Sequence, residues 1–356
     1  MNKGAVVFLL ILFFWSCEKK EDTFYGLPSA YGNIGELAVI SDDSVIIATS
    51  TTLESVFQKS IEGLPTHLPI FRLNIKPLSE ANNMHLRNYN LCVLFDASKP
   101  EVYKDLFGDS VVLSFQKKLK EGKQILLYKD LFATPQNVIL VIGNNSSEIK
   151  SLLEKHQNQL IDYAKESNRI NTRKEIYGGG VNKNLLLDSM LKVYGYGIAR
   201  PGGYRKSIIE TDSFYGFGKY PNEVWQGFYI YSEDFKDSSQ LKQSAIISRR
   251  NRVLKEKVQQ AGNGIDGGVA YMGTDEKNVV VSSSVKTING LYTVETRGWW
   301  EMVNGIMGGP FVSYTYLCPK INKIVTVDCI VFAPDGKFGS YLREAEIIAT
   351  TFAEKK

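Results

Sequence analysis

Residues 297–343 read RGWWEMVNGIMGGPFVSYTYLCPKINKIVTVDCIVFAPDGKFGSYLR, and we expect this stretch to decide the fold of the second half of the chain. It contains two adjacent tryptophans, a Gly-Gly-Pro break and two strand-like runs at 311–317 and 324–332. Such a density of aromatic and turn residues is typical of a core β-ribbon on which other elements pack. The stretch therefore predicts a central β-hairpin, and it holds no recognisable catalytic signature.

The segments on either side of this hairpin extend the same pattern. Asn289 and Gly290 separate strand-like runs at 278–288 and 291–296, and this dipeptide favours a two-residue type I′ hairpin turn. Downstream, apolar residues recur at helical spacing through 341–352, which predicts a closing amphipathic helix. The other elements that we predict here are a helix at 182–194, strands at 204–210 and 225–231 flanking an aromatic segment at 214–220, and a long helix at 238–260.

The first half of the chain alternates strand-like and helix-like segments. Three glycines at 178–180 mark its end, because consecutive glycines are flexible and contribute no packing. We predict strands at 36–41, 68–75, 89–96, 124–129 and 137–142, and helices in the second part of 45–61, at 115–120 and at 146–169. The predicted fold class is α+β, with two consecutive mixed α/β halves at 36–176 and 177–356. We expect largely antiparallel sheets, with helices on one face and a ferredoxin-like topology in each half.

The N-terminal residues differ in character from the rest of the chain. A single lysine precedes an uncharged apolar run at 5–15, which is too short to span a bilayer, since a span needs about 20 apolar residues. The small residue Ser16 and then Cys17 follow this run, so 1–16 is predicted to be a signal peptide for export. Residues 17–35 lack periodicity and contain several glycines, which predicts a flexible tether.

The sequence FWSC at 14–17 resembles the lipobox of bacterial lipoproteins, although two positions depart from the commoner Leu-Ala-Gly type. The resemblance implies that Cys17 receives a diacylglyceryl group, becomes the new N-terminus and anchors the protein to the membrane. The sequence KKED at 19–22 resembles the signal of a lysine followed by two acids that sends such lipoproteins to the cell surface. The expected location is therefore the outer membrane, at its periplasmic face or at the cell surface. A plain secretory signal is the alternative for this segment.

Composition limits the class of protein and its partners. Of the 356 residues 44% are apolar and 22% are charged, so a full core can form and global disorder is excluded. The formal net charge of +4 creates no strong field for polyanions, so we expect no nucleic-acid partner. Lipidation of Cys17 would leave Cys92, Cys318 and Cys329, an odd number that favours reduced packing thiols over a disulfide framework.

Several blocks of the sequence resemble a known family. RGWW at 297–300, MGGPFVS at 307–313, VFAP at 331–334 and LREAEII at 342–348 are similar to the C-terminal signature of a family of uncharacterised Bacteroidota lipoproteins. GLP at 63–65 and RRN at 249–251 are similar to its earlier blocks. The family has a domain of unknown function. The resemblance therefore implies a lipoprotein with a shared fold, and it transfers no catalytic residue.

Carboxylates in the aromatic C-terminal region are the one chemically open option for catalysis. Paired acids beside tryptophans can cleave or bind a glycan. The catalytic candidates are Glu295, Glu301 and Asp328, and the binding candidates are Arg297, Trp299 and Trp300. The alternative is structural, because acids at a helix start favour the helix dipole and neighbouring arginines neutralise acids.

Other motifs give no support for a cofactor or a metal ion. GNGIDG at 262–267 satisfies G-x-G-x-x-G, but it follows a predicted helix, whereas a dinucleotide site must precede one. The three histidines have no second histidine or cysteine at ligand spacing, so a zinc site is not expected. The basic run at 249–257 is typical of a solvated helix face, and contact with phosphate-bearing lipid or polysaccharide is the alternative.

Two functional hypotheses follow from the sequence. The first is a non-catalytic, membrane-anchored envelope lipoprotein that binds an envelope protein or a glycan, or supports an assembly, through its aromatic C-terminal region. The second is an anchored, glycan-directed hydrolase that uses two of the C-terminal acids. Neither hypothesis requires a cofactor.

Overall fold

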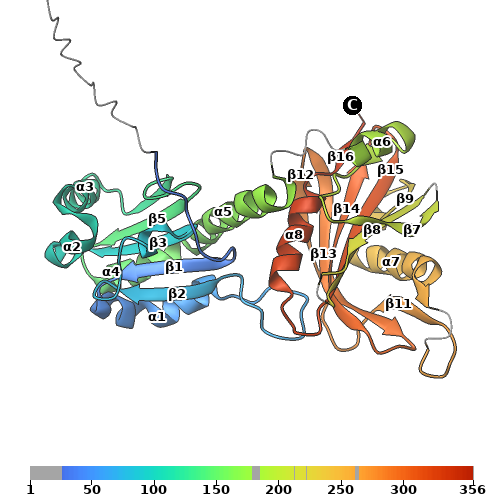
Figure 1. Ribbon diagram of the computed structural model, residues 1–356, viewed down its shortest axis with the longest axis horizontal. Coiled ribbons are helices and arrows are strands. Elements are labelled where there is room, and N and C mark those ends of the chain that lie inside the picture. The colour runs from blue at the N-terminus through green and yellow to red at the C-terminus, as the bar shows by residue number, and fades with distance from the viewer. Residues whose placement is uncertain (1–25, 179–184, 212, 222, 261–263, 356) are drawn as a thin grey trace, which may run out of the picture.

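The computed structural model describes residues 26–178, 185–211, 213–221, 223–260 and 264–355. The described chain forms two lobes, each built on its own large β-sheet, and the predicted α+β class is confirmed. We call residues 26–178 the N lobe and residues 185–355 the C lobe. The long helix α5 (Gln157–Tyr177) runs from the sheet of the N lobe toward the C lobe (Figure 1).

The N lobe contains a five-stranded sheet in the order β2-β1-β3-β5-β4. Its strands are β1 (Glu36–Ser41), β2 (Arg72–Pro77), β3 (Asn90–Asp96), β4 (Ile125–Lys129) and β5 (Asn137–Gly143). Every residue of β3 and of β5 is buried, as expected for central strands that are covered on both faces. Only β4 runs antiparallel to its neighbour, whereas β1, β2, β3 and β5 are parallel.

Helices cover both faces of this sheet. One face packs against α1 (Asp43–Phe57), α4 (Ser146–Lys155) and α5, and the other against η1 (His85–Arg87), η2 (Pro100–Tyr103), α2 (Lys104–Phe107) and α3 (Asp109–Lys120). The expected antiparallel, ferredoxin-like topology with helices on one face was therefore wrong for this lobe. The physical reason is that uninterrupted apolar runs such as NLCVLFD indicate burial on both faces but carry no information on strand direction.

The residues that precede β1 are part of the N lobe. Residues 17–35 were predicted to be a flexible tether, but the backbone of Ala30 donates to Thr134 and that of Tyr31 donates to Arg87. The amide of Gly35 donates to Asn168 Oδ1 of α5 at 3.1 Å. The tether prediction was wrong for these described residues, because local backbone pairing does not need an apolar pattern.

The C lobe contains a nine-stranded antiparallel sheet in the order β10-β11-β13-β14-β15-β9-β8-β7, with β12 pairing only with β13. Its strands are β7 (Arg205–Thr211), β8 (Phe214–Lys219), β9 (Trp225–Asp234), β10 (Gln259–Gln260), β11 (Ala270–Thr274), β12 (Ser282–Ile288), β13 (Leu291–Val303), β14 (Gly308–Cys318) and β15 (Lys323–Phe332). The two predicted hairpins are confirmed as β12–β13 and β14–β15, and Asn289 and Gly290 have the positive φ angles of a type I′ turn. Nine strands exclude a ferredoxin-like topology here as well.

Helices also cover both faces of the C-lobe sheet, contrary to the prediction of one covered face. One face packs against α8 (Gly339–Ala349), together with α6 (Leu185–Val193) and the small sheet of β6 (Tyr196–Gly197) and β16 (Ala353–Glu354). The other face packs against α7 (Gln243–Lys257). Several predicted segments were wrong. The segment 238–260 contains η3 (Ser238–Leu241), α7 and β10, 214–220 contains β8, and 146–169 is divided at His156. In the N lobe, α1 begins at Asp43 rather than in the second part of 45–61, and α3 begins at Asp109 rather than at 115.

The two lobes touch through several segments that are distant in sequence. Helix α5 lies beside α8, and Leu64 and Leu68 from the loop before β2 pack against the core of the C lobe. A Cβ atom on Gly63 would lie within 3 Å of the backbone of Arg297, so this loop meets β13 with no room for a side chain. The lobes therefore meet in an interface built from close backbone and side-chain contacts.

Gly309 is the tightest backbone position in the C-lobe sheet. A Cβ atom there would lie 1.9 Å from the carbonyl oxygen of Val331, which also accepts a 3.0 Å hydrogen bond from Trp300 Nε1. We expect Gly309→Ala to lower the free energy of unfolding by about 2 kcal/mol or more, since the strand must shift to accept a methyl group. Chemical denaturation measures this loss.

Gly202→Ala is the matched control, because nothing lies within 4 Å of the added Cβ atom. We expect its unfolding free energy to stay within about 0.5 kcal/mol of the unmodified chain. Equal losses in the two variants would contradict the packing account of Gly309.

Candidate functional site

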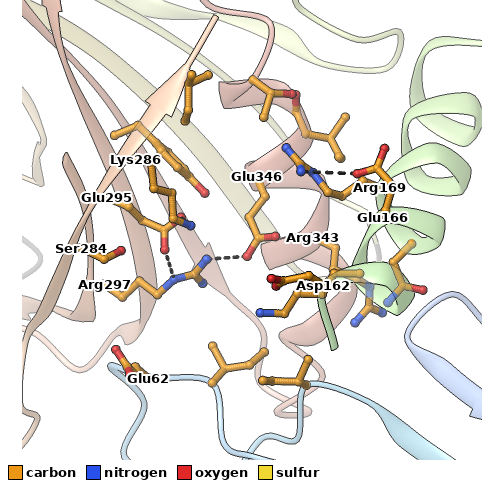
Figure 2. Close-up of a pocket in the computed structure, with 18 of the residues that line it drawn as sticks. Glu62, Asp162, Glu166, Arg169, Ser284, Lys286, Glu295, Arg297, Arg343 and Glu346 are labelled. Carbon is orange, nitrogen blue, oxygen red and sulfur yellow. Dashed lines mark hydrogen bonds and ion pairs between the residues drawn. The ribbon is translucent and has the colours of Figure 1, made fainter. Parts of the chain in front are cut away.

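A cleft of about 830 Å³ opens between the lobes. The C lobe lines it with β12, β13 and α8, and the N lobe lines it with α5 and the loop at 59–62. Figure 2 shows Glu346 reaching from α8 to Arg297, while Asp162, Glu166 and Arg169 of α5 lie on the opposite side. Charged side chains of both signs therefore enter one cavity from two lobes.

A chain of ionic contacts forms the C-lobe wall of this cleft. Arg297 Nε lies 3.0 Å from Glu295 Oε1, and Arg297 Nη2 pairs with Glu346 Oε1. Lys286 Nζ of β12 lies 2.5 Å from the second oxygen of Glu295. Glu295 is 6% exposed, so its carboxylate is held between two cations in a largely dry environment.

The charge state of this wall follows from its geometry. Burial opposes the ionisation of Glu295, but the Arg297 and Lys286 charges outweigh it and lower the pKa to about 2. Tyr314 lies opposite Glu295 on β14, and burial, together with the charges of Glu295 and Glu346, raises its pKa well above the ordinary value. Glu295 is therefore an ionised carboxylate at neutral pH and cannot act as a general acid there.

Arg343 is the one basic residue of α8, and much of its hydrogen-bonding capacity is unused. Its Nη2 donates to the carbonyl oxygen of Ile34 at 2.9 Å, whereas its buried Nε has no hydrogen-bond partner. Burial lowers the pKa of Arg343 below its ordinary value. Among the described residues Arg343 forms no ion pair with a carboxylate within 4.0 Å, so part of its guanidinium can still donate to an incoming acceptor.

Arg343 also lines a second cleft, of about 1080 Å³, on the other side of the contact between the lobes. Glu344 occupies the wall of this second cleft. Its Oε2 lies 2.5 Å from Lys219 Nζ and accepts a 2.7 Å hydrogen bond from Tyr204. The two acids of α8 are thus divided between the clefts, Glu346 in the first and Glu344 in the second, whereas Arg343 lines both.

The structure does not bring the three predicted catalytic acids together. Glu295 lines the cleft, and Glu301 lies six residues further along the same face of β13, about 20 Å away at the rise of a β-strand. Asp328 pairs with Ser313 and points to the opposite face of the sheet, toward α7. The hypothesis of a paired-acid site made from these residues is therefore wrong, because distance along β13 separates Glu301 from Glu295, and the sheet itself separates Asp328 from both.

Asp328 belongs to a buried ion pair instead. Arg250 Nε of α7 lies 3.0 Å from Asp328 Oδ1, and both side chains are 0% exposed. Burial raises the pKa of Asp328, whereas the Arg250 charge opposes the rise. The basic run of α7 is correspondingly not a simple solvated face: Arg249 and Arg250 are buried, and the Arg252 side chain is 64% exposed. The physical reason is that Asp328 lies buried beneath α7 and needs a cation beside it, which Arg250 supplies.

The two predicted binding tryptophans lie on opposite faces of β13. Trp300 is completely buried beside Trp225, so it belongs to the core rather than to a binding surface. Trp299 is half-buried and packs edge-to-face on Phe338 at a centroid distance of 5.6 Å. Only Arg297 and Glu295 of the predicted residues line the first cleft.

Sequence reasoning missed Lys286, Arg343 and Glu346 as members of the cleft. The hairpin turn could have revealed Lys286, since a two-residue loop at Asn289 and Gly290 sets Ser284 opposite Glu295 and places Lys286 one step diagonally away. No local signal connects α8 to β13, because that contact depends on how the helix packs on the sheet.

The predictions of lipidation, of no metal site and of no membrane-spanning segment concern different parts of the chain. Cys17 and the predicted signal peptide at 1–16 lie outside the described residues. Within the residues that the structure does describe, no group of three or more His, Cys, Asp or Glu side chains is arranged to hold a metal ion. None of the described helices has the length and apolar character needed to cross a bilayer.

Comparison with known protein families divides the chain between two of them. Residues 30–177 match the family described as Domain of unknown function (DUF8532). Residues 184–351 match the family described as Domain of unknown function (DUF4837). No curated protein matches the chain. The two matches follow the N lobe and the C lobe closely, and the families carry no assigned activity.

Glu295 provides a test of the charged wall. Because its folded pKa of about 2 lies below the ordinary value of 4.5, its ionised form stabilises the fold at neutral pH. This contribution is lost as the pH falls from 4.5 toward 2. We expect Glu295→Gln to lower the unfolding free energy at pH 7 by about 3 kcal/mol, since two cations lose their shared partner. Denaturant titrations across this pH range should show a shallower acid-side slope for the variant.

Glu301→Gln is the matched control, since it makes the same chemical change on the same face of the same strand. We expect its effect to stay within about 0.5 kcal/mol, as is usual for substitutions outside buried networks. An unchanged acid slope in Glu295→Gln would contradict the assignment of a charge-compensated carboxylate.

Proposed function

We propose that this protein is a lipid-anchored binding protein of the cell envelope, which holds an envelope partner in the cleft between its two lobes. The lipobox-like FWSC at 14–17, with Cys17 as the lipidated residue, supports the anchor. The outer membrane, at its periplasmic face or at the cell surface, is the proposed location. Multiple acyl chains make such an anchor effectively permanent, since each buried methylene contributes about 0.8 kcal/mol.

The chemistry of the cleft favours binding over hydrolysis. A glycosidase needs one carboxyl group with a raised pKa and a second one nearby. Glu295 instead has a lowered pKa between Arg297 and Lys286, and it has no functional partner in Glu301 or Asp328. Groups held in fixed charge states suit the recognition of a polar ligand, because they need not change protonation when it binds.

The observation that carries the binding proposal is the partly unused guanidinium of Arg343. It lines the cleft, is largely buried and retains a buried Nε without a partner. Nη1 of the same guanidinium forms no hydrogen bond within the described chain, so a carboxylate or a similar anionic group in the cleft can accept a charge-assisted hydrogen bond from it. The proposed ligand is therefore polar and carries an anionic group.

The anchor can be tested by labelling. We expect cells fed with labelled palmitate to mark the full chain and to keep it in the membrane fraction. Cys17→Ala removes the acyl acceptor, so the variant should carry no label and should lose its membrane attachment. Detergent phase separation followed by gel electrophoresis measures both properties. An unlabelled unmodified chain in the aqueous phase would contradict lipidation.

The cleft can be tested with a photo-reactive amino acid placed at Ser284, which lines it. We expect a cross-linked adduct in living cells from this position and none from the same probe at Leu113, an exposed residue of the distant helix α3. Arg343→Met should lower the yield of the Ser284 adduct about tenfold or more, because charged hydrogen bonds contribute about 1.5–3 kcal/mol.

Arg252→Met makes the same chemical change on an exposed side chain of α7 and serves as the control for Arg343→Met. Its adduct yield should equal that of the unmodified chain. Thermal unfolding of each variant separates a loss of binding from a loss of folding. Equal adduct yields from Ser284 and Leu113 would contradict a binding role for the cleft.

A further inference from the structure

Strand β12 forms an open edge of the C-lobe sheet at the mouth of the cleft. It pairs with β13 along seven residues, from Ser282 opposite Arg297 to Ile288 opposite Leu291. Five of its seven residues are exposed. Within the described chain, no other backbone group hydrogen bonds with residues 282–288. Its outer side therefore presents an unpaired row of backbone donors and acceptors.

The hairpin register identifies which backbone groups point outward. In a two-residue hairpin the residues next to the turn exchange hydrogen bonds, and bonded and non-bonded pairs then alternate along the strands. Counting from Ile288, the amides and carbonyls of Ser283, Val285 and Thr287 face away from β13. Three evenly spaced residues thus offer six backbone groups to another strand.

The side chains of β12 leave room for such a strand on the cleft side. Ser282 and Ser284 are small and line the cleft together with Lys286. Natural edge strands are usually protected by charges, proline or a bulge. The only charge on this edge is Lys286, and Glu295 already holds it against the sheet. The edge therefore lacks the features that normally prevent strand addition.

We infer that the occupant of the cleft is an extended polypeptide segment that adds to β12 as a further strand and carries a carboxylate toward Arg343. This inference rests on the proposed binding function and names its partner. Backbone pairing supplies affinity in this mode, while alternate side chains enter the adjacent cleft and supply specificity. The outward backbone groups of β12 favour a polypeptide over a glycan, because a glycan cannot satisfy a regular row of alternating amide and carbonyl groups.

A second copy of the chain is the other occupant that a free edge allows. The cleft side of β12 faces the N-lobe loop at 59–62 and helix α5 across the same cavity. This cavity of about 830 Å³ accepts the side chains of one strand and is too small to hold a second lobe. The geometry therefore points to a segment of another protein.

The test uses a displayed library of random peptides of about ten residues, a length that covers a seven-residue edge with its ends. The library is selected on the full chain in detergent, and we expect it to yield peptides rich in β-branched residues with at least one acid. Amide hydrogen exchange then reports the mode of binding. The amides of Ser283, Val285 and Thr287 should exchange quickly in the free protein and slowly in the complex.

Val285→Pro removes an outward amide without touching the bonds to β13, a position where an edge strand tolerates proline. We expect it to lower peptide affinity about tenfold or more, whereas Val285→Thr, which keeps the amide, should leave affinity unchanged. Slow exchange of Ser284 and Lys286 in both variants verifies that the β12–β13 hairpin has remained intact.

The outcomes separate this inference from the proposed function. Binding that is weakened by Arg343→Met but not by Val285→Pro would overturn strand addition and keep the cleft as a binding site. Peptides that bind while the three outward amides still exchange quickly would overturn it as well. A dimer in sedimentation, with those amides already slow in the free chain, would replace the peptide by a second copy. Absence of both peptide binding and the Ser284 adduct would overturn the proposed function itself.

Discussion

The Arg297 guanidinium is the contact on which the C-lobe wall of the cleft depends. It joins Glu295 on its own strand to Glu346 on α8, so it fixes the helix against the sheet on the side that faces the cleft. Its backbone lies against Gly63 of the N lobe, with no space for a side chain between them. One residue thus orients the helix, the strand and the neighbouring lobe. The buried charges around it are acceptable because each has an opposite charge at hydrogen-bond distance.

Alternation along β13 then divides the chemistry of the C lobe between two environments. Glu295 and Arg297 face a cleft that opens to solvent, whereas Trp300 and the residues paired with Asp328 face a closed core under α7. Both faces contain buried ion pairs, but their consequences differ. The Arg250–Asp328 pair is sealed at 0% exposure, so it can contribute only to structure and specificity of packing. The pairs at the cleft border a cavity, where a ligand can reach the charges next to them.

The sequence predicted the elements whose signals are local. The Asn289-Gly290 turn, the hairpin at 311–317 and 324–332 and the amphipathic stripe of α8 all follow from residues within one or two elements. It did not predict the parallel sheet of the N lobe, because runs such as those of β3 and β5 indicate burial but not direction. The hypothesis that two of the acids Glu295, Glu301 and Asp328 act together failed for a related reason. Whether an acid on β13 and an acid on β15 share a face depends on two successive strand registers, β13 with β14 and β14 with β15. Composition does not specify these registers.

The contacts between the lobes hold the cleft open, as the proposed binding role requires. Arg343 of α8 donates to the carbonyl of Ile34 in the N lobe, and Tyr177 of α5 donates to the carbonyl of Ala199 in the C lobe, so each of these two helices holds a backbone segment of the other lobe. A preformed site loses little conformational entropy on binding, which leaves more of the interaction energy for affinity. A flexible partner such as an extended peptide carries that entropic cost instead. The open edge of β12 and the charged residues of α8 therefore suit a disordered segment that becomes ordered on binding. A partner whose binding required the two lobes to move would not need a preformed cleft.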